Sequence, residues 1–98
     1  MIKIIGQTFR DERIILDDHE YEHCTFERCE LSYQGGPTHF AHNVLIECQW
    51  NLDGAALRTV RFLSFLYQEG QQQAVEELID QIRRSKPFPG QGRSILLN

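Results

Sequence analysis

The first half of the chain holds seven side chains of the types that bind zinc. Imidazole nitrogens and thiolates are common protein ligands of Zn²⁺. His39 and His42 also have a His-x-x-His spacing. Whether these seven side chains can bind one ion together depends on the secondary structure in which they lie. The seven residues are His19, His23, Cys24, Cys29, His39, His42 and Cys48.

Thiol-based catalysis is the second chemistry that these residue types suggest. Cys24 follows His23 directly, and a nucleophilic thiolate needs a histidine within reach. Neighbouring residues of a strand point to opposite faces, so these two side chains separate. The chain has no Gly-x-Ser-x-Gly, P-loop or Gly-x-Gly-x-x-Gly motif. We therefore expect no enzymatic activity and no cofactor.

The elements that position these residues form an internal repeat of nineteen residues. The segment YEHCTFERCELSYQGG (21–36) aligns with FAHNVLIECQWNLDGA (40–55). The alignment pairs His23 with His42 and Cys29 with Cys48. Large apolar residues fall on large apolar residues, and this pattern is stronger evidence than the few identities.

A shorter period of five residues runs inside the repeat. It suits neither an α-helix nor a simple strand, but it suits a chain that turns a corner every five residues. Four corners give a coil of about twenty residues, and one deletion near Gly35-Gly36-Pro37 would leave nineteen. Large residues recur at Leu16, Tyr21, Phe26, Leu31, Leu45 and Trp50, and two positions before them stand Ile14, His19, Cys24, Cys29, Asn43 and Cys48.

This pattern over residues 14–52 resembles the pentapeptide-repeat proteins, whose coils form a right-handed quadrilateral β-helix. The resemblance implies that the large residue and the small residue two positions before it point inward. With its helical end, the chain also looks like small uncharacterised bacterial proteins, a likeness that implies no function. We expect burial of Cys24, Phe26, Cys29, Leu31, Leu45, Cys48 and Trp50.

The repeat places His23 and His42 outward and the cysteines inward, so the seven ligand types do not converge. A specific metal site is therefore not expected, and the outward His23–His42 pair is the one candidate for occasional metal binding. Coils of a β-helix lie ~4.8 Å apart, so Cys29 and Cys48 become neighbours. They are either small structural side chains or, since bridged Cα atoms lie ~4.4–6.8 Å apart, a disulfide.

Two helices follow the repeat. Asp53 is a suitable N-cap for a helix over 54–69, and Gly70 is a suitable stop. A second helix is predicted over 71–85, ended by Pro87. We expect a single domain over residues 1–98, in which β-helix coils (1–52) are capped by a helical hairpin (53–86) and followed by a tail (87–98). The fold class is mainly β, a short right-handed β-helix with a C-terminal helical cap.

Charge and composition indicate which partners the chain binds and where in the cell it is found. The 98 residues carry 10 basic and 14 acidic groups, a net charge of −4, which argues against nucleic acid. Residues 1–52 hold four basic and nine acidic groups, a net of −5. The chain has no transmembrane run and no secretory signal, so we expect a cytoplasmic protein that does not bind membranes. Three cysteines, an odd number, agree with a reducing compartment.

The function that we expect is a small, soluble, non-enzymatic protein-interaction or regulatory module. Two alternatives are an inhibitor of a DNA-handling or defence protein, carried by a phage or mobile element, and a metal-binding protein using His and Cys. We also expect a homodimer, built from the helical hairpin and tail or from the N-terminal strand edge. The candidate interaction residues are Glu22, Glu27, Arg28, Glu30, Glu47, Phe62, Phe65, Ile95, Leu96 and Leu97.

Overall fold

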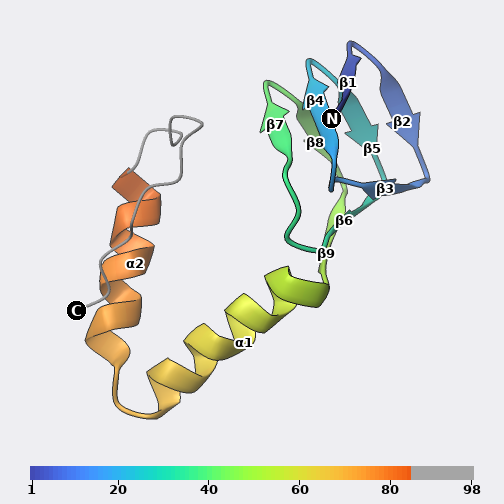
Figure 1. Ribbon diagram of the computed structural model, residues 1–98. Coiled ribbons are helices and arrows are strands. Elements are labelled where there is room, and N and C mark those ends of the chain that lie inside the picture. Colours follow the sequence, from blue (N-terminus) through green and yellow to red (C-terminus); the bar gives the residue numbers. More distant parts are fainter. Residues whose placement is uncertain (85–98) are drawn as a thin grey trace. The chain divides into compact units, whose positions relative to one another are not determined.

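The computed structural model describes residues 1–84, which form nine short strands and then two helices (Figure 1). The chain divides into two compact units: the coil unit, Met1–Thr59, and the helical unit, which begins at Val60. The strands are β1 (Ile2–Ile5), β2 (Thr8–Arg10), β3 (Arg13–Ile15), β4 (His19–Glu22), β5 (Thr25–Glu27), β6 (Glu30–Tyr33), β7 (His39–Ala41), β8 (Val44–Ile46) and β9 (Gln49–Leu52).

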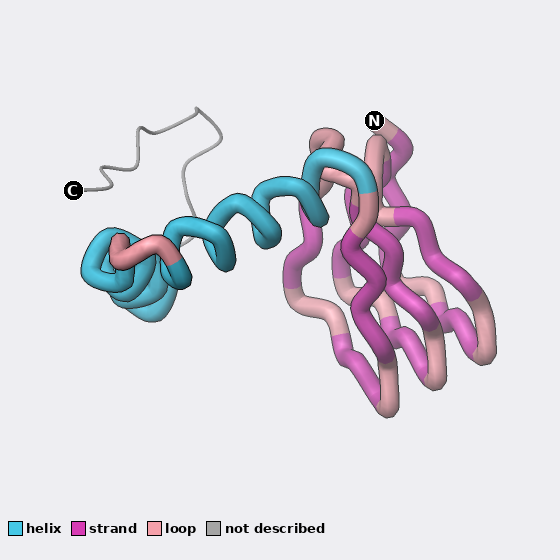
Figure 2. Tube along the Cα trace, turned by 90° about the horizontal axis from the view of Figure 1, so that it is seen from below, coloured by secondary structure: helices cyan, strands magenta, loops and turns pink. Residues whose placement is uncertain are grey.

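The coil unit contains three parallel sheets of three strands each. Their strand orders are β1-β4-β7, β2-β5-β8 and β3-β6-β9. Each run of three consecutive strands is therefore one coil, and the next coil stacks on it, as Figure 2 shows in the strands drawn in magenta. The arrangement is β-helix-like, as the repeat predicts.

The pairing register confirms the nineteen-residue repeat for the second and third coils. Phe26 pairs with Leu45, nineteen positions later. The first coil differs, because Phe9 pairs with Phe26 only seventeen positions later. The connection from β3 to β4 is shorter than the one from β6 to β7. The difference in coil length therefore lies in this connection and not in the strands.

Only three strands of each coil lie in sheets, and the fourth side is a connection without strand structure, 16–18 in the first coil and 34–38 in the second. This corrects one assignment of the five-residue period. Ile14, and not Leu16, pairs with Leu31 as the central residue of its strand. Leu16 lies just beyond β3, where its N–H donates to the carbonyl of Ser32 at 2.9 Å. Both Ile14 and Leu16 are buried.

The core lies mainly in the middle coil. The predicted burial of Cys24, Phe26, Cys29 and Leu31 is confirmed, each being at most 2% exposed. The predicted burial of three third-coil residues is wrong: Leu45 is 40% exposed, Trp50 is 56% exposed and Cys48 is half-buried. The reason is that no further coil among the described residues stacks on the third one, so its apolar side chains are covered on one side only. The core residues are Ile14, Leu16, Tyr21, Cys24, Phe26, Cys29 and Leu31.

The small side chains two positions before the central residues connect successive coils. The thiol of Cys24 lies 3.6 Å from the carbonyl oxygen of Ile4, and that of Cys29 lies 3.5 Å from the one of Phe9. In each pair the carbonyl belongs to a central residue one coil earlier. A thiol is a weak donor, so these cysteines both pack and hydrogen-bond. All three thiols, Cys48 included, are free in the structure.

Both predicted helices are present. Helix α1 spans Gly54–Gln68 and α2 spans Gln72–Arg84. The carbonyl of Asp53 accepts the first helical hydrogen bond, from Leu57 at 3.1 Å, and its carboxylate accepts one from the N–H of Gly54 at 2.8 Å. Gly70 has φ of +92° after α1, where a glycine pays no steric penalty. We also expect the helices to cover the end of the coils. This contact would join the two units, and it stays a prediction.

Hydropathy sets one further limit on the helices. Within residues 1–84, neither helix combines the length and the apolar character that crossing a bilayer requires.

Candidate interaction surfaces

One corner of the coil unit stacks charged side chains. Asp11, Arg28 and Glu47 occupy the same corner in successive coils, each with positive φ, between 51° and 54°. The Arg28 guanidinium donates to both carboxylate oxygens of Asp11, at 2.8 and 3.2 Å. This hydrogen bond lowers the pKa of Asp11 and raises that of Arg28. Arg28 therefore connects the second coil to the first, although its side chain lies on the surface.

Intramolecular ion pairs also engage two of the predicted acidic interaction residues. Arg10 donates to the carboxylate of Glu27 at 2.6 Å. Glu22 lies 3.9 Å from the Lys3 ammonium and 3.6 Å from the His39 imidazole. Basic side chains thus offset part of the acidic surface that the charge distribution predicts.

The remaining two acidic residues lie beside Arg28. Glu30 and Glu47 are exposed and line a hollow of about 290 Å³ together with Arg28, Cys29 and Gln49. The positive charge of Arg28 at this hollow makes it a mixed surface, and not a purely acidic one.

The structure stacks the predicted histidine pair on the outside of the coils. The rings of His23 and His42 lie 5.1 Å apart, centroid to centroid, and are nearly parallel at 12°. Both residues have positive φ at the corner that Gly6 occupies in the first coil. Among residues 1–84, the groups of three possible metal ligands that the structure brings together do not include this pair.

A different trio of possible metal ligands comes together on the neighbouring sheet. Ligand atoms of Glu20, Glu22 and His39 all lie within 4.8 Å of one another. Glu20 and His39 are register partners in β4 and β7, and Glu22 lies two residues further along, on the same face. This trio was not among the predicted ligands, although the nineteen-residue repeat pairs Glu20 with His39.

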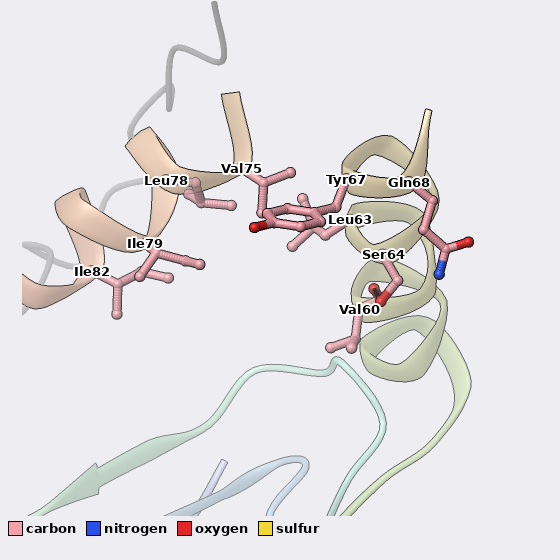
Figure 3. A pocket seen from close by; sticks show the side chains of 9 residues that line it. All are labelled: Val60, Leu63, Ser64, Tyr67, Gln68, Val75, Leu78, Ile79 and Ile82. Carbon is pink, nitrogen blue, oxygen red and sulfur yellow. Dashed lines mark hydrogen bonds between the residues drawn. The ribbon is translucent and has the colours of Figure 1, made fainter. Parts of the chain in front are cut away.

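The two helices enclose an apolar groove, which Figure 3 shows from close by. Its volume is about 380 Å³. At one end, the hydroxyl of Tyr67 donates to Glu76 at 3.3 Å, which links α1 to α2. Apolar residues of the two helices therefore face each other across this groove. The groove is lined by Val60, Leu63, Ser64, Tyr67, Gln68, Val75, Leu78, Ile79 and Ile82.

Helix α1 carries a second apolar face. At about 3.6 residues per turn, Phe62 and Phe65 point away from the side that Val60, Leu63 and Tyr67 present to the groove. Phe62 is 55% exposed and Phe65 is 58% exposed, and α1 has no buried residue at all. Ile95, Leu96 and Leu97, the other apolar interaction residues predicted, lie outside the described residues.

Comparison with protein-family models, with curated proteins and with solved structures finds no match in any of the three.

Proposed function

We propose that this chain is a non-enzymatic protein-interaction module in which α1 is the docking helix. The observation that carries the proposal is the apolar surface of α1 on two opposite faces, with no residue of the helix buried. An apolar face of a helix normally packs against another element. The groove with α2 accounts for one face, and the face of Phe62 and Phe65 is left for a protein partner.

The coil unit carries the docking helix in this proposal, because α1 follows β9 directly in the chain. Its inward residues five positions apart, and the small residues two positions before them, support a right-handed coil of the pentapeptide-repeat kind. Three free thiols support a reducing, cytoplasmic location. The alternative of an inhibitor of a DNA-handling or defence protein rests on the acidic charge of the first half of the chain, and the ion pairs formed by Arg10, Lys3 and Arg28 weaken that support.

Replacing Phe62 and Phe65 together by alanine is expected to weaken partner binding while leaving the helix intact, because alanine has the higher helix propensity. The wild type, this double variant and a Gln72→Ala/Gln73→Ala control would each be immobilised to capture proteins from cells. A partner captured by the wild type and the control would then be purified. We expect its Kd to rise at least tenfold, about 1.4 kcal/mol, for the double phenylalanine variant only. Equal binding to all three forms would contradict the proposal.

A second candidate function, divalent metal binding, is favoured by the trio Glu20, Glu22 and His39. Two carboxylates and one imidazole are ligands that zinc accepts, and three protein ligands leave a position for water or substrate. Titrating the tag-free protein with zinc in a calorimeter is expected to show one ion per chain. His39→Ala should remove this binding and His23→Ala should preserve it. Equal loss in the two variants, or no binding by the wild type, would exclude the site.

A further inference from the structure

The described part of the helical unit, residues 60–84, buries too little to be stable by its own packing. Among its described residues only Ala74 and Val75 are buried. α1 has 15 residues and α2 has 13, and isolated helices of about this length are marginal in water. A single hydrophobic contact between two short helices does not make up this deficit. Something further must cover their apolar side chains.

The groove between the helices is the surface to be covered. Its lining is mostly aliphatic, and Val60 and Tyr67 on its α1 side are 44% and 40% exposed. On α2, the apolar lining residues follow the spacing i, i+3, i+4, i+7 and form one narrow stripe. Such a stripe is the kind of seam along which helices pack in bundles.

Charges at the two ends of the groove indicate what fits it. Val75 lies beside Tyr67, near the loop that joins the helices, whereas Val60 and Ile82 lie apart at the other, open end of the groove, as Figure 3 shows. At that open end stand Arg61 on α1 and Arg83 and Arg84 on α2, whereas Glu76 stands at the loop end. Arg83 and Arg84 lie 3.9 and 4.0 Å from the carboxylate of Asp80, which offsets one of these positive charges. The open end therefore keeps a net positive charge, with Arg61 on its α1 side, and the loop end carries the negative charge of Glu76.

We propose that the groove is occupied by the helices of a second copy of this chain. The two grooves face each other, and the two-fold axis lies in the plane between them, at right angles to the long direction of the groove. This half-turn sets the open end of each copy against the loop end of the other. The two apolar grooves then form one four-helix core, and Arg61 of one copy faces Glu76 of the other. A surface that is complementary to itself after a half-turn is the requirement of a two-fold dimer. This interface leaves the Phe62–Phe65 face available, so it does not depend on the partner proposed above.

Light scattering of the full chain at micromolar concentration is expected to give twice the chain mass of 11.5 kDa. Leu63→Asp places a charge in the groove and should weaken dimerisation at least tenfold. Phe62→Asp, the same change one residue away on the opposite face, should leave the dimer within twofold of the wild type. A wild-type monomer, or a dimer lost with Phe62→Asp and kept with Leu63→Asp, would overturn the proposal.

Charge reversal tests the same interface without an apolar residue being changed, so it covers the case in which Leu63→Asp unfolds the helices. Arg61→Glu and Glu76→Arg should each weaken the dimer, and the double variant should restore it. Unchanged dimerisation in both single variants would refute the two-fold arrangement. Deleting residues 85–98 should leave the dimer intact, and a dimer that appears only after this deletion would show that those residues occupy the groove instead.

Discussion

Replacing Phe26 by alanine is expected to lower the free energy of unfolding by about 3–5 kcal/mol, the range for a large aromatic side chain in a core. Phe26 is 0% exposed. Its ring stacks between Phe9 at 5.3 Å and Phe40 at 5.6 Å, and meets the edge of Tyr21 at 5.4 Å. Removing it leaves a cavity that adjoins all three coils. Urea unfolding followed by circular dichroism measures the change.

Trp50→Ala is the matched control for this prediction. Trp50 is the larger side chain, but it is 56% exposed in the last coil, so we expect a loss of only about 1 kcal/mol. A loss as large as that of Phe26→Ala would contradict the control and show that the third coil is covered in solution. The repeat alone assigns both residues to the core and does not distinguish them.

Replacing Gly35 by alanine is expected to cost about 2–3 kcal/mol, because two unfavourable effects combine. Gly35 has φ of +105°, which L-residues rarely adopt, and a Cβ there would lie 2.9 Å from the Cβ of Ala55. The surrounding connection has little freedom to move. The carboxylate of Asp17 accepts hydrogen bonds from the N–H groups of Gly36, at 2.6 Å, and Gln34, at 2.9 Å.

Gly6→Ala separates backbone strain from the steric clash. Gly6 also has positive φ, +67°, but a Cβ there would meet nothing within 4 Å. The equivalent corners of the next coils hold His23 and His42 with similar φ, so the conformation accepts a side chain at a cost of about 1 kcal/mol. Urea unfolding of both variants should therefore show a clearly larger loss for Gly35→Ala. Equal losses would mean that Ala55 moves away.

The same connection has a predictable response to pH. Partial burial by itself would raise the pKa of Asp17, but the N–H donors of Gly36 and Gln34 together hold the pKa below its ordinary value. A carboxyl whose pKa is lower in the folded state stabilises the fold above its unfolded pKa. That contribution is lost as the pH falls below the unfolded pKa and through the folded one, so the connection is an acid-labile part of the coil unit.

Much of the fold was predictable from the order of the residues, because local chemistry decides it. The period of five and the repeat of nineteen identified the inward positions of the middle coil, including Cys24 and Cys29. Asp53 and Gly70 marked the limits of α1, since capping and positive φ depend on adjacent residues.

Tertiary structure decided which of these residues are covered and which charges meet. Leu45 and Trp50 have the pattern of core residues, yet their burial depends on whether another coil follows, and a local pattern does not contain that information. The pairing of Arg28 with Asp11 and of Arg10 with Glu27 depends on a first coil that returns after seventeen residues, two fewer than the next. The length of a coil depends on how many residues connect its third strand to the first strand of the next coil. Only the folded chain shows this number, and it decides which side chains of successive coils lie beside each other.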